Sequence, residues 1–132
     1  MQPRRVIFPD STSLVSAAIK AAIPSATVAS KRPGTLVKGT TYIQYRNDSG
    51  PENGLLKTER YGINCWAPKF REASDTLRTV MAHFRSNVPG TGPVVRVVGG
   101  TGPFEVMGDG DDVDSHAHFY CTVELTVRGS NF

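Results

Sequence analysis

Two histidines beside a run of aspartates form the group of side chains in this sequence with the clearest potential for chemistry. Residues 109–118 read DGDDVDSHAH, so one residue separates His116 from His118. Alternate residues of a strand share a face, and imidazole and carboxylate groups are common metal ligands. The spacing raises a small metal-dependent hydrolase as one hypothesis, in which the remaining ligands would be Asp109, Asp111, Asp112 and Asp114.

The surrounding residues do not complete such a metal site. No third neutral ligand accompanies the histidine pair. A calcium loop starting at Asp109 would need glycine at its sixth position and glutamate at its twelfth, where this chain has Asp114 and Tyr120. We therefore expect neither a metal nor another cofactor, and we interpret the four aspartates as a solvated loop that faces a partner or a lumen.

Other patterns associated with catalysis are also incomplete. The run Gly99–Pro103 (GGTGP) has glycines typical of a phosphate-binding loop, but no lysine follows it and no helix begins there. We predict a tight turn between two strands. Cys65 and Cys121 lie in apolar strand patterns outside any CxxC motif, which favours reduced, buried thiols. No local motif supports nucleophilic catalysis, so we expect no catalytic residues and no enzyme activity.

The segment 119–129 (FYCTVELTVRG) is the best-specified structural element. Its residues alternate strictly between apolar and polar, with Phe119, Cys121, Val123, Leu125 and Val127 on one side. This period of two predicts a long, well-paired strand with one face on the core. Its other face is polar and suits contact with a partner.

Two helices and several further strands are expected before it. The first helix starts near Asp10 and ends before Pro24. The second begins after Pro68, and strands are expected at 26–30, 41–46, 59–66, 94–98 and 104–107. The predicted fold is α+β, one domain over residues 1–132, with a mostly antiparallel or mixed sheet and both helices on one face. The predicted core anchors are Trp66, Phe70, Leu77 and Phe84.

A connection rich in turn-forming residues joins two of these strands. Residues 47–54 read NDSGPENG and are predicted to form the mobile loop of a long hairpin. Because such a loop has few apolar groups, it cannot offset its own ordering entropy, and we expect it to order on assembly. Its candidate interface residues are Asn47, Asp48, Glu52, Asn53 and Lys57.

Charge is distributed unevenly along the chain. The net charge is +3, but four of the 12 acidic residues lie in the 109–114 segment, so the rest carries 15 basic against 8 acidic residues. This asymmetry suits oriented contact with a partner and is too diffuse for a nucleic-acid groove. No signal peptide or membrane-spanning run is evident, so we expect synthesis and assembly in the cytoplasm.

Several short motifs, in order, give the chain a resemblance to one family. They are Lys31-Arg32-Pro33, Cys65-Trp66-Ala67 preceding Glu72–Leu77, Gly102-Pro103-Phe104, and the closing Tyr120–Gly129. In order and spacing, over nearly the whole chain, they resemble the tail-terminator proteins of long-tailed phages, in particular those that infect actinobacteria. The chain differs from that pattern after Arg46, where NDSGPENG stands in place of a tight Gly-Gly turn.

The resemblance implies a structural role in the virion. A tail terminator is a small α+β subunit that forms a hexameric ring at the head-proximal end of the tail tube, stops tube polymerisation and provides the docking surface for the head. Its partners would be copies of itself, the major tail tube protein and a neck or connector protein. Genomic DNA would pass through the lumen without specific binding, and no membrane is involved. The alternative is another neck component, a head-closure or head–tail joining protein.

Overall fold

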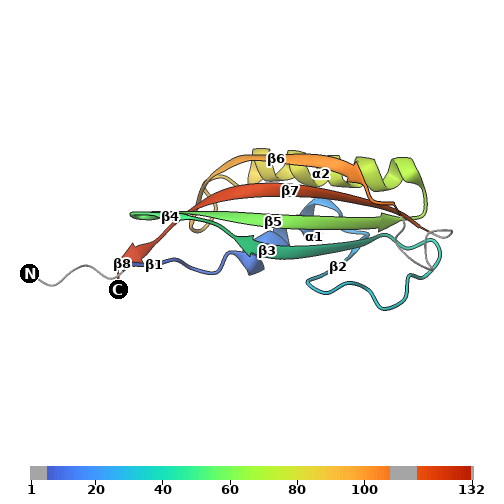
Figure 1. Cartoon of the computed structure of the whole chain (residues 1–132), viewed down its shortest axis with the longest axis horizontal. Coiled ribbons are helices and arrows are strands. Elements are labelled where there is room, and N and C mark those ends of the chain that lie inside the picture. The colour runs from blue at the N-terminus through green and yellow to red at the C-terminus, as the bar shows by residue number, and fades with distance from the viewer. Residues whose placement is uncertain (1–5, 108–115, 132) are drawn as a thin grey trace, which may run out of the picture.

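The computed structural model describes residues 6–107 and 116–131, which form a mixed sheet with two helices (Figure 1). The main sheet has the strand order β2-β3-β5-β7-β6, with β4 paired to β5, and a separate ribbon pairs β1 with β8. The elements are β1 (Val6–Ile7), α1 (Thr12–Ala22), β2 (Thr27–Ala29), β3 (Tyr42–Ser49), β4 (Glu52–Asn53), β5 (Leu56–Ala67), α2 (Phe70–Asn87), β6 (Val94–Glu105), β7 (Ala117–Arg128) and β8 (Ser130–Asn131).

Strand β7 is central in the sheet, between β5 and β6. It pairs antiparallel with β5 from Leu56↔Arg128 to Ala67↔Ala117. The side chains of Phe119, Cys121 and Leu125 are buried, so the predicted alternation and the core face of this strand are confirmed. Only β2 runs parallel to its neighbour, β3, which makes the sheet mixed.

Both helices pack on the same face of the sheet and share one apolar core with it. Asp10 accepts a hydrogen bond from the backbone N–H of Thr12 at 2.9 Å and so satisfies one of the free donors at the start of α1. Helix α2 buries Leu77 and Phe84 completely against the sheet, as its apolar stripe predicts. Within the described residues, neither helix is long and apolar enough to cross a membrane.

The predicted core anchors do not share one environment. Leu77 and Phe84 belong to the main core, whereas Trp66 is buried on the opposite face of the sheet with Leu36 and Tyr42. Phe70 is 58% exposed, so its assignment as a core anchor is wrong. Because a helical side chain leans towards the helix N-terminus, the first residue of α2 projects beyond the packed surface. Its ring meets only the edge of Phe119, at 4.8 Å between centroids.

The glycine-rich run Gly99–Pro103 is not a turn, and that prediction is wrong. Strand β6 continues through it from Val94 to Glu105 and stays paired with β7 across three register irregularities. Glycine is needed here because a Cβ atom on Gly100 would lie only 2.1 Å from the carbonyl oxygen of Thr122. The close approach of two backbones, rather than a change of chain direction, accounts for Gly100 and Gly102.

Residues 47–54 are mostly strand, so the long open loop predicted for them is also wrong. Strand β3 extends to Ser49, and β4 pairs with the start of β5 through Glu52↔Lys57 and Asn53↔Leu56. The backbone N–H of Thr58 donates to the carbonyl oxygen of Pro51 at 2.9 Å. The turn-forming residues allow the chain to reverse tightly between β3, β4 and β5. Most of the segment is therefore paired as strand instead of forming an open loop. Ordering on assembly stays a prediction.

Candidate assembly surface

The sheet has an outer face that neither helix covers, and paired charges occupy its middle. Arg46 contacts Asp48 at 2.6 Å, and Arg60 of β5 contacts Glu124 of β7 at 3.0 Å. The hydrogen bond from Arg46 to Asp48 raises the pKa of the Arg46 guanidinium. These opposite charges cancel over short distances, so this part of the face is polar without a strong local field.

One end of the outer face is closed by the segment 30–41, which lies over a stack of rings. The indole of Trp66 stacks on the imidazole of His118 with 4.3 Å between centroids and 20° between planes. Arg32 belongs to the 30–41 segment, and its guanidinium carbon lies 5.7 Å from the centroid of the Trp66 ring. This geometry combines aromatic stacking with a cation–π contact, and it accounts for the burial of Trp66.

Both histidines of the candidate metal motif are buried and engaged in hydrogen bonds. His116 Nε2 lies 2.8 Å from the carbonyl oxygen of Thr40, which can only accept, so this nitrogen donates. His118 Nε2 lies 2.7 Å from Asn64 Oδ1, and the Asn64 amide donates to Gln44 Oε1 at 3.0 Å. The solvated position expected for the histidines is therefore wrong. His116 ties the 30–41 segment to the chain just before β7, and His118 ties β7 to β5.

The metal-ligand hypothesis gains no support from the described part of the chain. Residues 6–107 and 116–131 contain no group of three or more His, Cys, Asp or Glu side chains arranged to hold a metal ion. The four aspartates of the predicted acidic loop lie outside these residues: Asp109, Asp111, Asp112 and Asp114. Their assignment to a lumen or a partner therefore stays a prediction.

The two cysteines are inert structural residues in the main core. Cys65 and Cys121 are buried and are not joined by a disulfide, which confirms that prediction. Burial disfavours the thiolate and raises the pKa of each thiol to about 12. A thiol that stays protonated at neutral pH is a poor nucleophile.

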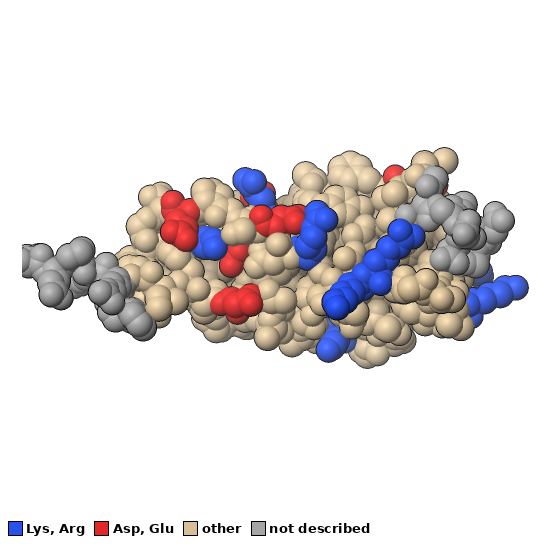
Figure 2. Space-filling view, turned by 60° about the horizontal axis from the view of Figure 1, so that its bottom comes forward, with Lys and Arg blue, Asp and Glu red and all other residues tan. Residues whose placement is uncertain are grey.

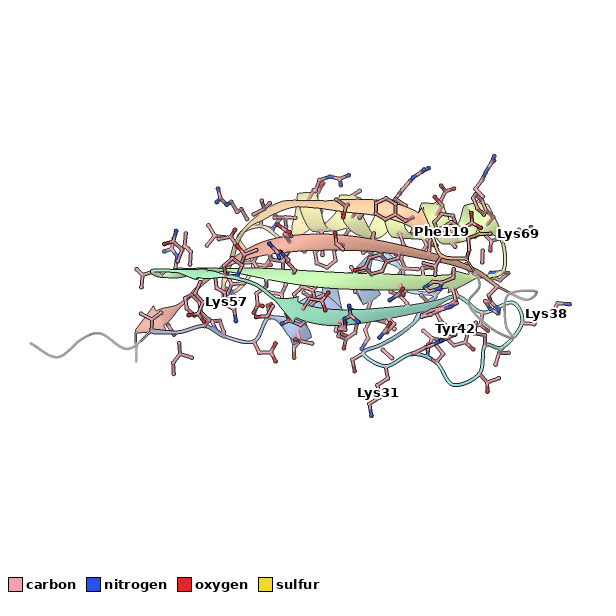
Figure 3. The ribbon with its side chains drawn as sticks, viewed as in Figure 1. Lys31, Lys38, Tyr42, Lys57, Lys69 and Phe119 are labelled. Carbon is pink, nitrogen blue, oxygen red and sulfur yellow. The ribbon has the colours of Figure 1, made fainter. Side chains whose placement is uncertain are left out.

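A polar pocket of about 400 Å³ lies where the chain enters α1, beside the start of β5, and Figure 3 labels Lys57 from its lining. We call it the Glu59 pocket. It contains two predicted interface residues, Asn47 and Lys57, and is lined by Phe8, Pro9, Asp10, Thr12, Asn47, Ser49, Lys57 and Glu59. The other three interface residues lie elsewhere. Asp48 pairs with Arg46, and Glu52 and Asn53 are exposed on β4.

Hydrogen bonds fix the wall of the pocket around Tyr61. The buried Tyr61 hydroxyl lies 2.6 Å from Ser11 Oγ and accepts from Asn47 Nδ2 at 3.2 Å. Burial raises the pKa of Tyr61. At the rim, Asp10 uses Oδ1 to accept from both the hydroxyl and the backbone N–H of Thr12. These bonds lower the pKa of Asp10 and keep it ionised, while its Oδ2 remains open to another donor.

Glu59 differs from every other group in this pocket. It is 3% exposed, and its Oε2 atom is buried with no hydrogen-bond partner. The ion pairs formed by the described residues join Arg46 to Asp48, Arg60 to Glu124 and Arg78 to Asp75, and none includes Glu59. A buried carboxylate without a partner is costly. The sequence contained a signal for it, because Glu59 occupies the core-facing side of its strand, two residues before Tyr61.

The chain was also compared with known proteins. No protein-family model matches it, and no curated protein is similar to it. Its function is therefore argued from its sequence motifs and its geometry.

Proposed function

We propose that this protein is a structural subunit of a phage tail, which forms a closed ring, most simply a hexamer, on the head-proximal end of the tail tube. The ring would stop tube polymerisation and present a docking surface to the head. The tail tube and the hexameric ring in this proposal come from the resemblance to tail terminators, which rests on the order and spacing of short motifs. The structural observation that supports the proposal best is a sheet covered by helices on one face only.

The two lateral edges of the sheet differ, which suits a head-to-tail contact. On one side, β2 pairs with only Tyr42–Gln44 of β3 and leaves the rest of that strand open among the described residues. On the other side, β6 is the edge strand, and its neighbourhood exposes Val98, Phe104 and Met107. Contacts between unlike surfaces generate a ring when the rotation between subunits closes.

The paired charges of the outer face are compatible with a surface that DNA passes. Firm lysine or arginine contacts with phosphates release counterions and retain nucleic acid in a salt-dependent way. Arg46 and Arg60 instead contact carboxylates of the same subunit. A lumen lined by such pairs would let DNA slide. We therefore assign the outer face of the sheet to the lumen.

The test mixes the purified chain with polymerising tube subunits and measures tube lengths by electron microscopy. We expect a narrow length distribution that shortens as the ratio of this protein to tube subunit rises, with a ring at one end of each tube. Buffer and an unrelated protein of similar size serve as controls. Tubes that keep extending at saturating protein would overturn the proposal. If the protein then bound tail-less heads instead, the alternative neck role would replace it.

A further inference from the structure

We propose that the Glu59 pocket receives an arginine side chain from the N-terminal segment, residues 1–5, of a neighbouring copy of the chain. This inference rests on the proposed ring and names one of its contacts. The pocket brings together a buried carboxylate without a partner, a free oxygen of Asp10 and a location near the N-terminal end of β5.

The charge of the pocket fits one added cation. Asp10 and Glu59 contribute two carboxylates, and Lys57 contributes one ammonium group. A single guanidinium would neutralise the remaining negative charge. It has five N–H donors in a planar fork, so it can meet the open Oδ2 of Asp10 and the Glu59 carboxylate together. The Glu59 carboxylate can present either oxygen, because rotation about its terminal bond is soft.

The charge of the surrounding surface also favours a cationic ligand. On the face shown in Figure 2, acidic side chains gather on the half nearer the β1–β8 ribbon, and most of the basic side chains lie on the other half. A cationic segment approaching the ribbon end would therefore be attracted towards the pocket. Of the exposed lysines of the 30–41 segment, Lys38 lies at the opposite end of the molecule and Lys31 lies nearer its middle (Figure 3).

The N-terminal segment has the composition and the starting point that the pocket requires. Its sequence is MQPRR, with Arg4 and Arg5 next to β1. It has no acidic residue to compete for them. Because Arg4 and Arg5 directly precede β1, the chain can carry them only roughly 7 Å from Val6, which limits the contact to an adjacent subunit.

A neighbouring copy is a better recipient than the same subunit. The described chain begins at Val6 in the ribbon, which protrudes from one end of the sheet (Figure 1). The ribbon is held firmly at its base, since a Cβ atom on Gly129 would lie 2.4 Å from Val6 Cγ1 and 3.1 Å from Phe8. To reach its own pocket, beside Phe8 and Asp10, the segment would have to reverse along its own strand.

The first experiment measures assembly of the full chain by native mass spectrometry over a concentration series. The variants are Glu59→Gln, the double variant Arg4→Ala/Arg5→Ala, and the control Lys31→Ala/Lys38→Ala, which removes the same charge from residues that do not line the pocket. We expect the first two to weaken assembly by about tenfold or more and the control to match the wild type. Rings of unchanged affinity in the Arg4/Arg5 variant, or a wild-type chain that is monomeric at every concentration, would overturn the inference.

The second experiment mixes the two assembly-deficient variants in equal amounts. Glu59→Gln subunits keep the arginines, and Arg4→Ala/Arg5→Ala subunits keep the carboxylate, so each mixed pair can form one contact and no more. We expect heterodimers without rings. Monomers only, at concentrations where the wild type assembles, would show that the arginines act within their own subunit or not at all, and would overturn the inference.

A third measurement separates a fold defect from an assembly defect. Glu59→Gln added to the unassembled Arg4→Ala/Arg5→Ala chain should leave its melting temperature unchanged or raised, because a buried unpaired charge is removed. A fall of several degrees would show that Glu59 is already paired in the subunit and would overturn the inference. If the arginine variant still forms rings that arrest tubes, only this inference fails. If rings depend on both sites but do not arrest tubes, the proposed function fails.

Discussion

The two ends of β5 bury polar groups in opposite ways. Near its C-terminal end, Asn64 receives a hydrogen bond from His118 and donates one to Gln44, under the stacked ring of Trp66. Near its N-terminal end, Glu59 is more deeply buried than Asn64 but leaves Oε2 without a partner. One end of the strand therefore carries a hydrogen-bonded side-chain network, and the other carries a buried carboxylate that no ion pair among the described residues includes.

On our proposal, this difference separates polar groups that stabilise the subunit from polar groups that bind a neighbouring subunit. A satisfied buried network rigidifies a fold, whereas a half-satisfied one is costly unless another molecule completes it. The Trp66 end is covered by the 30–41 segment of the same chain. The Glu59 end lines a pocket beside the start of α1. We therefore expect mutations at the first end to reduce subunit stability and mutations at the second to affect assembly.

The buried thiols of Cys65 in β5 and Cys121 in β7 provide a reference that is independent of both polar groups. Burial raises the pKa of Cys65 and Cys121 from 9.0 to about 12. The unfolded chain therefore loses these protons first, so the contribution of the thiols to the free energy of unfolding should be constant below pH 9 and fall between pH 9 and 12, by about 4 kcal/mol per thiol. Urea unfolding across this range checks it. A flat profile would contradict the burial of the thiols.

Among substitutions at the two ends of β5, Trp66→Ala should lower the free energy of unfolding the most. Removing the buried indole leaves a cavity and unstacks His118, which should cost about 3–5 kcal/mol in the free energy of unfolding. The matched control is Phe70→Ala, which removes a mostly exposed ring and should cost less than about 1 kcal/mol. Urea unfolding of the two variants measures the difference. Equal losses would mean that the outer cluster does not stabilise the subunit.

Asn64→Leu should have an intermediate effect. The leucine leaves the His118 ring nitrogen and the Gln44 carbonyl without the bonds that Asn64 supplies, which should cost about 1–3 kcal/mol. Native mass spectrometry should show assembly unchanged at temperatures where the variant is folded. A loss of assembly in a folded Asn64→Leu subunit would remove the functional distinction between the two ends.

Lys57→Ala should have the smallest effect on the subunit. Lys57 lines the Glu59 pocket but forms none of the ion pairs found among the described residues. Its removal should change the free energy of unfolding by less than about 0.5 kcal/mol. A loss above about 1 kcal/mol would indicate that Lys57 neutralises Glu59 within the subunit, and the contrast between the ends of β5 would then disappear.

Local patterns in the sequence determined the fold class and most of the core. The alternation from Phe119 to Val127 predicted a strand with one buried face, and the apolar stripe of α2 predicted the burial of Leu77 and Phe84. Such periodicities translate directly into faces, because the geometry of strands and helices is local. The burial of both cysteines follows from the same rule.

Only the tertiary structure decided what lies at the ends and edges of these elements. Helix α2 starts at Phe70 and leaves its ring outside the core, and β7 keeps Gly99–Pro103 extended by pairing with it. The 30–41 segment buries His116, which the sequence suggested was solvated. The position of Glu59 on the core side was visible in the sequence, but the missing partner was not. Hydrogen-bond satisfaction depends on residues distant in the chain, so it becomes definite only when the fold brings them together.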